Sequence, residues 1–211
     1  MFGDGALTFQ EFAMGEKVPL ATIHDAVLEF LRGRDDAVLF GAQAVNAYVK
    51  EPRMTQDVDI ASTRAKDLAE ELRRHLNKRL HIAARVRTVR QGIGYRIYQV
   101  RKPENRHLVD LRPVNELPPA QHVRRVLVVT PPELIANKLM SMVDRVHKPK
   151  GLIDRADLYR VLLAFPELKS EVGPVAKRLR VAKAPLEVWQ AWKELVRQQI
   201  TAESDEDKFD F

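Results

Sequence analysis

The stretch RMTQDVDIAS (53–62) contains two carboxylates, Asp57 and Asp59, separated by a single residue. Apolar Val58 and Ile60 fill the alternate positions, which predicts a β-strand with both acids on one side and the apolar pair facing the core. Like charges this close repel one another, whereas Mg²⁺ is typically held by one or two carboxylates together with substrate phosphates. The pair therefore predicts a divalent-cation site, and a solvent-facing strand side is the alternative.

Two further features could join such a site. A third acid, Asp110, interrupts the apolar run LVDL at 108–111. An acid there is costly unless it is paired, hydrogen-bonded or metal-bound, although an edge strand would let it face water. Gly41 separates a predicted buried strand from a predicted helix, where glycine permits a close backbone approach and a helix N-terminus favours phosphate. A simple tight turn is the alternative at Gly41.

The elements that would position these residues follow from apolar spacing and turn residues. Thr22 and Thr63 precede helical stretches and are predicted N-caps. Three helices are predicted in this part: 21–34, one that begins after Gly41, and 63–79. The predicted strands are 36–40, 53–62, 84–90 and 125–130, together with two strands that flank a hairpin turn at 103–105.

The pattern changes at TPPE (130–133), which predicts a helix start. Thr130 is the predicted cap, Pro131 the first helical residue, and Glu133 would complete a capping box. The predicted helices of this part are about 131–147, 154–164, 168–181 and 185–200. We therefore expect an α+β domain at 1–130, a helical domain at 131–201 and a disordered acidic tail at 202–211.

Two cations lie on one stripe of the first of these helices. Lys138 and Arg145 share the helical spacing of apolar Ile135 and so occupy a side expected to face a core or a cleft. They could point at a triphosphate, or pack their stems on apolar surface with their heads in water. Asp154 could cap the next helix, and Asp157 could pair with Lys138 or Arg145.

The composition is basic and lacks cysteine. The 211 residues carry a net charge of +6 and a pI of about 9.6. From Arg73 to Arg125, 14 Lys and Arg face three acids, a local charge of +11. Such a block attracts polyanions, with a merely solvated surface as the alternative. The absence of cysteine excludes disulfides, and no apolar segment has membrane-spanning length, so we expect a cytoplasmic protein.

Two segments resemble a known family. VLFGAQAVNAYVKEPRMTQDVDIAS (38–62) resembles the Gly-rich turn, helix and Arg-x-Thr-x-Asp-x-Asp strand of the AbiEii-like toxins within the DNA polymerase β nucleotidyltransferase superfamily. PPELIANKLMSMVDRVHKPKGLIDRADLYRVL (131–162) resembles the later segment of that family, which carries Lys, Arg and two acids. The resemblance covers about 37–164. It implies an α+β, nucleotidyltransferase-type mixed sheet with flanking helices, followed by a helical C-terminal half.

The resemblance also implies an activity: transfer of a nucleoside monophosphate from an NTP to a hydroxyl, with RNA, specifically a tRNA end, as acceptor and an antitoxin protein as partner. Ala42 stands where many relatives have Ser, so nucleotide binding is the property most affected by this departure. There are two alternatives. One is a catalytically weak or inactive protein of the nucleotidyltransferase fold that binds RNA, nucleotide or a partner protein, and the other is an enzyme with a protein or small-molecule acceptor. The resemblance implies that Asp57, Asp59 and Asp110 bind Mg²⁺ (or Mn²⁺), and that the same three and Lys138 are catalytic. The residues implied to bind the nucleotide and its phosphates are Gly41, Ala42, Gln43, Arg53, Lys138 and Arg145. Asp154 and Asp157 would be the acids of the second motif.

Overall fold

The computed structural model describes residues 18–202. Residues 1–17 and the predicted acidic tail beyond residue 202 lie outside this range. The described residues form two compact units: unit 1 holds 18–44 and Arg53–Val129, and unit 2 holds Val45–Pro52 and 130–202. Within the described range, no helix combines the length and apolar character needed to cross a membrane.

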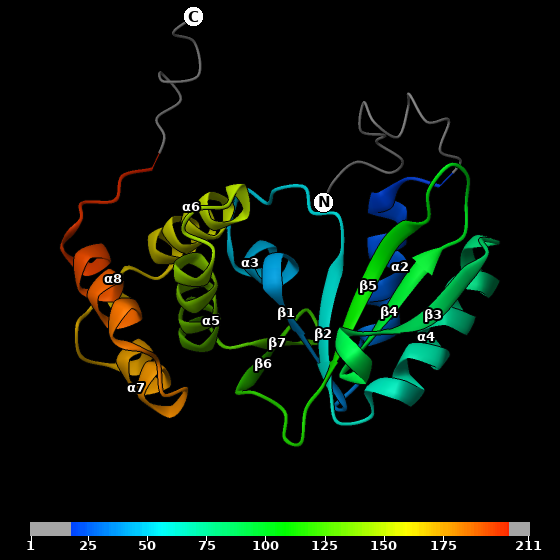
Figure 1. Ribbon diagram of the computed structural model, residues 1–211, viewed down its shortest axis with the longest axis horizontal. Coiled ribbons are helices and arrows are strands. Elements are labelled where there is room, and N and C mark those ends of the chain that lie inside the picture. The colour runs from blue at the N-terminus through cyan, green and yellow to red at the C-terminus, as the bar shows by residue number, and fades with distance from the viewer. Residues whose placement is uncertain (1–17, 203–211) are drawn as a thin grey trace, which may run out of the picture. The chain divides into compact units, whose positions relative to one another are not determined.

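Unit 1 contains a seven-stranded mixed sheet (Figure 1). The strand order is β3-β4-β5-β2-β1-β7-β6. Strand β2 runs parallel to β5 and β1 parallel to β7, whereas the remaining neighbours are antiparallel. This mixture confirms the predicted α+β class. The bounds are β1 Ala37–Phe40, β2 Val58–Ser62, β3 Ala84–Val89, β4 Gly94–Gln99, β5 Arg106–Pro113, β6 Ala120–Val123 and β7 Val126–Val129, with a short 3-10 turn, η1 Arg90–Gly92, between β3 and β4.

Helices α2 (Leu20–Leu31) and α4 (Ala65–Leu80) cover one face of the sheet and lie behind β3, β4 and β5 in Figure 1. Leucines at steps of four on α4, Leu68, Leu72 and Leu76, are fully buried, because residues i and i+4 share one side of a helix. We call the opposite side of β3–β5 the open side of the sheet. There Arg85 and Arg87 of β3 are exposed.

The predicted threonine caps are wrong. Helix α2 begins after Pro19, and α4 begins after Arg64. At the start of α4 the side chain of Ser62 makes the hydrogen bonds instead. Its Oγ accepts the Arg64 N–H at 3.0 Å and donates to the Asp36 carbonyl oxygen at 2.7 Å. A serine at the end of β2 therefore organises the helix start that was assigned to Thr63.

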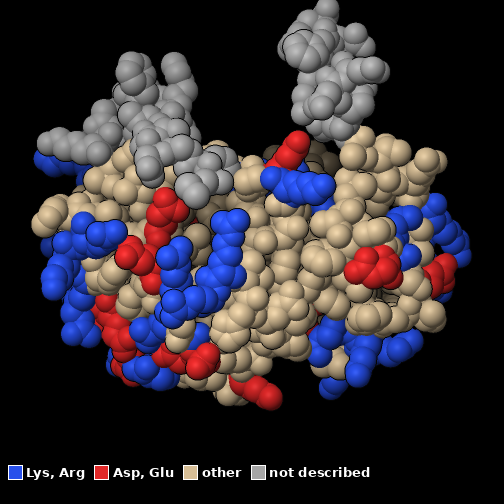
Figure 2. Space-filling view, turned by 180° about the vertical axis from the view of Figure 1, so that it is seen from behind, with Lys and Arg blue, Asp and Glu red and all other residues tan. Residues whose placement is uncertain are grey.

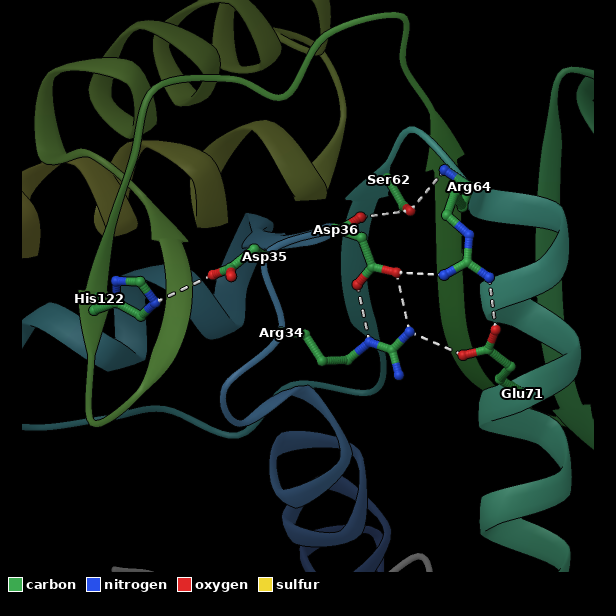
Figure 3. Close-up of polar contacts among 7 residues, drawn as sticks. All are labelled: Arg34, Asp35, Asp36, Ser62, Arg64, Glu71 and His122. Atoms are coloured by element: carbon green, nitrogen blue, oxygen red, sulfur yellow. Dashed lines mark hydrogen bonds and ion pairs between the residues drawn. The ribbon is translucent and has the colours of Figure 1, made fainter.

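A four-membered ion-pair network joins α2, β1 and α4 (Figure 3). Arg34 contacts Asp36 at 2.9 Å and Glu71 at 2.8 Å, and Arg64 contacts the same two acids at 2.9 Å each. The Arg34 hydrogen bond lowers the pKa of Asp36 below its ordinary value. The network lies at the end of β1 and β2 where Ala37 pairs with Ser62, away from the end where Phe40 pairs with Asp59.

Unit 2 is helical. Pro131 is the first residue of α5, as predicted, but no side chain caps this helix. The capping box is wrong because Glu133 pairs with Arg178 and accepts the Asn137 amide instead. The bounds are α5 Pro131–Asp144, α6 Pro149–Ala164, η2 Pro166–Leu168, α7 Pro174–Val181 and α8 Leu186–Arg197, and the short helix α3, Gly41–Tyr48, crosses from unit 1 into unit 2.

Candidate active site

The strand register brings two of the predicted acids together. Asp59 on β2 lies opposite Asp110 on β5 and also opposite Phe40 on β1. Asp57 directly precedes β2. The predicted alternation is confirmed, because Val58 and Ile60 are fully buried while Asp57 and Asp59 remain partly exposed.

Gly41 lies against the carboxylate of Asp59. Its φ is +69°, a left-handed conformation that favours glycine. A Cβ at this position would lie 2.1 Å from Asp59 Oδ2. Glycine is therefore required here both by the backbone conformation and by the space, and α3 begins directly beside the acid.

Ala42 and Gln43 form the first turn of α3. The Gln43 amide nitrogen lies 2.9 Å from Nδ1 of His24, which comes from α2. This contact ties the side chain of Gln43 to the protein. Arg53 donates from Nη1 to the carbonyl oxygen of Met54 at 3.0 Å.

Asp110 is clamped by two side chains that the sequence did not single out for the site. The Arg96 guanidinium donates to both of its carboxylate oxygens, each at 2.8 Å. The Nε2 of His107 lies 3.0 Å from Asp110 Oδ1, and the Nδ1 lies 3.4 Å from Asp57 Oδ2. His107 thus bridges two acids.

The ionisation of Asp110 follows from this clamp. Burial alone would raise the pKa of Asp110, but the hydrogen bonds from Arg96 and His107 outweigh burial and hold the pKa well below its ordinary value. The same pairing, together with the charges of Asp57 and Asp59, raises the pKa of Arg96. Asp110 is therefore a carboxylate throughout the physiological pH range.

A β-bulge explains why His107 and Asp110 meet. Residues three apart on a regular strand point to opposite sides of the sheet. Here Ile97 pairs with Val109 whereas the next residue, Tyr98, pairs with His107, which leaves Leu108 as the extra residue. The extra residue returns His107 to the side of Asp110.

These donors fit a divalent cation. One ligand atom each from Asp57, His107 and Asp110 lie within 4.8 Å of one another. Carboxylate oxygens are the ligands that Mg²⁺ prefers, and Asp59 lies beside Asp110 in the register.

The cations and acids of the second predicted motif form a separate buried cluster within unit 2. Lys138 Nζ donates to Asp154 Oδ1 at 2.9 Å and to Asp157 Oδ2 at 2.6 Å. Arg145 Nη1 reaches Asp154 Oδ2 at 3.0 Å. Asp157 is fully buried and Lys138 nearly so. The predicted pairing of Asp157 with Lys138 is confirmed, and a solvated Lys138 head is excluded.

The predicted N-cap role of Asp154 is wrong. Helix α6 begins at Pro149, five residues earlier than the sequence pattern indicated, so Asp154 lies inside the helix. Gly151 permits this early start, because a Cβ there would lie 2.2 Å from the Arg145 carbonyl oxygen. Arg145 itself follows the last residue of α5.

The family described as "Nucleotidyl transferase AbiEii toxin, Type IV TA system" matches residues 26–184, which is most of the chain. The chain belongs to this family. It is a nucleotidyltransferase enzyme, in agreement with the resemblance seen in its sequence.

Solved structures of low sequence identity share the fold. The Megavirus polyadenylate synthase aligns with a TM-score of 0.57 and 11% identity over 74% of this chain, which spans only 34% of the viral protein. JHP933 from Helicobacter pylori aligns with a TM-score of 0.53 and 12% identity over 91% of this chain and 94% of its own. A putative nucleotidyltransferase from H. pylori aligns with a TM-score of 0.51 and 13% identity. The alignment covers 90% of this chain and 93% of the other. No curated protein sequence is significantly similar.

Proposed function

We propose that this AbiEii-family enzyme transfers a nucleoside monophosphate from an NTP to a hydroxyl of an RNA, specifically a tRNA end, in a reaction that requires a divalent cation. The observation that carries the proposal is the row of carboxylates on β2 and β5 beside the start of α3. Asp59 and Asp110 are in register, Asp57 shares His107 with Asp110, and Gly41 brings the backbone against Asp59.

Asp57, Asp59 and Asp110 would hold Mg²⁺ (or Mn²⁺). Such an ion supplies neutralisation of the triphosphate charge and a lower pKa for the attacking hydroxyl. The clamp by Arg96 and His107 keeps Asp110 ionised and oriented for this role. The backbone N–H groups of Ala42 and Gln43, at the N-terminus of α3, would receive a phosphate of the NTP even though Ala42 has no hydroxyl.

In the proposed reaction, the acceptor oxygen attacks the α-phosphorus of the NTP. A new P–O bond to the acceptor forms, the bond from the α-phosphorus to the oxygen that bridges it to the β-phosphate breaks, and pyrophosphate leaves. The hydroxyl proton would pass to the carboxylate of Asp110. Because the clamp makes this carboxylate a weak base, the transfer would depend on the lower hydroxyl pKa that a bound cation supplies.

Lys138 and Arg145 are proposed to neutralise phosphate charge during this displacement. The two side chains differ in how available they are. Lys138 is buried and occupied by Asp154 and Asp157, whereas the Arg145 side chain is 30% exposed and its guanidinium has donors beyond its bond to Asp154. Arg145 is therefore the stronger candidate for direct phosphate contact, and Lys138 for positioning α6 against α5.

RNA is favoured over a protein or small-molecule acceptor by the basic block between Arg73 and Arg125, since counterion release drives binding to a phosphate backbone. Because the family is described as toxins of type IV toxin–antitoxin systems, an antitoxin protein is the proposed partner in the cell.

The test incubates purified protein with Mg²⁺, total RNA and each α-labelled NTP in turn. Asp59→Asn removes a proposed ligand, and Asp25→Asn, an exposed acid of α2, is the matched control. Label in an RNA band that depends on Mg²⁺, is lost in Asp59→Asn and persists in Asp25→Asn is the expected result. Label on protein instead would change the acceptor, and label that resists both metal removal and Asp59→Asn would overturn the proposed site.

A further inference from the structure

The open side of the sheet carries the carboxylates and a row of basic residues in continuous register. Asp110 on β5 lies opposite Arg96 on β4, and Arg96 lies opposite Arg87 on β3. Residues directly opposite each other on neighbouring strands point to the same side of a sheet. With about 4.8 Å between strands, Arg87 lies about 10 Å from Asp110 across the sheet.

The second row runs through Tyr98. Arg85 on β3 lies opposite Tyr98 on β4, and the bulge places Tyr98 opposite His107. His107 contacts both Asp57 and Asp110. Tyr98 is therefore separated from the carboxylates by one side chain.

Two basic residues of this side, Arg85 and Arg87, differ from Arg73 and Arg79 of the helical side in having no acidic partner. On α4, Arg73 pairs with Glu70 at 2.8 Å and Arg79 pairs with Glu29 at 3.1 Å. Figure 2 shows the helical side of unit 1 as a mixture of basic and acidic side chains. Arg85 and Arg87 are exposed, and no carboxylate of residues 18–202 forms an ion pair with either. The uncompensated charge of the basic block thus includes these two arginines beside the carboxylates.

An aromatic ring accompanies the two arginines. The guanidinium carbon of Arg87 lies 5.6 Å from the centre of the half-buried Tyr98 ring. Proteins that bind single-stranded nucleic acid combine a positive track for the backbone with aromatic rings on which bases stack. Arg85, Arg87 and Tyr98 supply both components on one side of one hairpin.

From this arrangement we propose that β3 and β4 form the acceptor-strand site, which takes the single-stranded end of the RNA. Arg85 and Arg87 bind backbone phosphates, and Tyr98 stacks a base next to the terminal nucleotide, whose hydroxyl lies at Asp110. The inference rests on the proposed RNA acceptor and assigns the residues that hold it. A single strand fits better than a duplex, because only an unpaired base can stack on an aromatic side chain.

Fluorescence anisotropy with a labelled single-stranded oligoadenylate, measured over a series of KCl concentrations, tests the site. Arg85→Gln/Arg87→Gln is compared with Arg73→Gln/Arg79→Gln, which removes the same charge from the helical side. The first pair should weaken binding on the order of 10-fold and reduce the salt slope by about 1.4, since each phosphate contact on a single strand contributes about 0.7. The second pair should change the affinity less than about twofold.

Tyr98 is tested by Tyr98→Leu and Tyr98→Phe. Loss of stacking should weaken binding at least about fivefold in the leucine variant, whereas the phenylalanine variant keeps the ring and should bind within about twofold of the wild type. Thermal unfolding of each variant separates lost binding from lost fold. The same oligonucleotide annealed to its complement should bind more weakly and be insensitive to Tyr98→Leu.

The outcomes separate this inference from the proposed function. If the wild type labels RNA and the two double variants bind it equally, the acceptor-strand site is refuted while the enzyme's function stands. Equal binding by the leucine and phenylalanine variants of Tyr98 would refute the stacking role. If the wild-type protein neither binds nor labels RNA but labels a protein, both the RNA acceptor and this site are refuted, and only the nucleotidyl-transfer chemistry remains.

Discussion

At the scale of single residues, Gly41 is the position of the site that tolerates substitution least. Its left-handed φ and the 2.1 Å separation between a would-be Cβ and Asp59 Oδ2 are two independent constraints. A side chain here would displace the carboxylate of Asp59, one of the proposed metal ligands. Gly41 therefore serves the proposed site by leaving room for this carboxylate.

We therefore expect Gly41→Ala to abolish measurable nucleotidyl transfer. Gly92→Ala is the matched control, because Gly92 also has a positive φ (96°) but nothing lies within 4 Å of its would-be Cβ. Both variants bear a backbone cost of about 1 kcal/mol or more, which thermal unfolding measures. Equal loss of activity in both variants would show that backbone strain, and not displacement of Asp59, is the cause.

The sequence predicted the three acids but not their clamp. Alternation of polar and apolar residues revealed Asp57 and Asp59, and an acid within an apolar run revealed Asp110. His107 carried no such signal, because its three-residue separation from Asp110 predicts opposite sides of a strand. Only the bulge at Leu108 brings them together, and a bulge depends on how β4 and β5 pair.

At the scale of elements, α5 and α6 are joined by charges in a place where charges are costly. Lys138 is held by Asp154 and Asp157, and Asp157 is fully buried. Removing one partner from a buried ion pair leaves the other charge uncompensated, which is more destabilising than replacing the whole pair.

Asp157→Asn should lower the free energy of unfolding of unit 2 by about 3 kcal/mol. Glu187→Gln, an exposed acid at the start of α8, is the control and should change it by less than about 0.5 kcal/mol. Urea unfolding followed by fluorescence measures both. A small effect for Asp157→Asn would mean that Asp154, which accepts from Lys138 at 2.9 Å in the native protein, suffices to satisfy the Lys138 ammonium.

The network of Arg34, Asp36, Arg64 and Glu71 predicts a pH dependence for unit 1. The folded-state pKa of Asp36 lies below its ordinary value of 3.8. Its stabilising effect is therefore fully present above about pH 4 and is lost as the pH falls through the lower, folded-state pKa.

Asp36→Asn should accordingly destabilise unit 1 near neutral pH by about 1–2 kcal/mol, because hydrogen bonds to charged groups are lost. The difference from the wild type should disappear at acidic pH below the folded-state pKa of Asp36. Thermal unfolding by circular dichroism as a function of pH provides the measurement, with Asp25→Asn as the control. A difference that persists unchanged into strong acid would show that the network is not the source.

Helix starts illustrate the limit of local sequence patterns. The proline at 131 correctly predicted a helix start, since Pro131 is the first residue of α5. At α6 the sequence pattern predicts a start at Asp154, whereas the helix begins at Pro149. None of the four side chains predicted as caps makes a capping hydrogen bond; these are Thr22, Thr63, Thr130 and Asp154. A proline lies at the start of α2, α5 and α6 instead, and at α4 the side chain of Ser62 accepts the Arg64 N–H.

At the scale of the whole molecule, each unit has its own buried core, and the two tryptophans report on only one of them. Both Trp189 and Trp192 lie in α8 of unit 2. Trp192 is fully buried and donates to the Ser170 carbonyl oxygen at 3.2 Å. The intrinsic tryptophan fluorescence therefore monitors the helical unit.

We expect Asp157→Asn to move the fluorescence midpoint to lower denaturant concentration, and Asp36→Asn to leave it unchanged. Far-UV circular dichroism should respond to both variants because both units contain helices. A fluorescence midpoint that shifts equally in the two variants would show that the units unfold in one cooperative transition.

The fold class was predictable at this scale because strand and helix periodicities differ strongly along the chain. The strand order was not, because parallel pairs such as β2 with β5 and β1 with β7 join segments far apart in sequence. The local pattern predicts that a strand exists, but it does not predict which strands become its neighbours.

Helix α3 has a further consequence for how proteins of this kind can recombine. The chain leaves unit 1 between Ala44 and Val45, returns after Pro52, and leaves again after Val129. Tyr48 packs edge-on against Phe165 with ring centres 5.6 Å apart, both within unit 2. A single genetic crossover near residue 130 would therefore set a native Tyr48 against a foreign helical unit. A stable chimera requires the segment 45–52 to be inherited together with the helices it packs on.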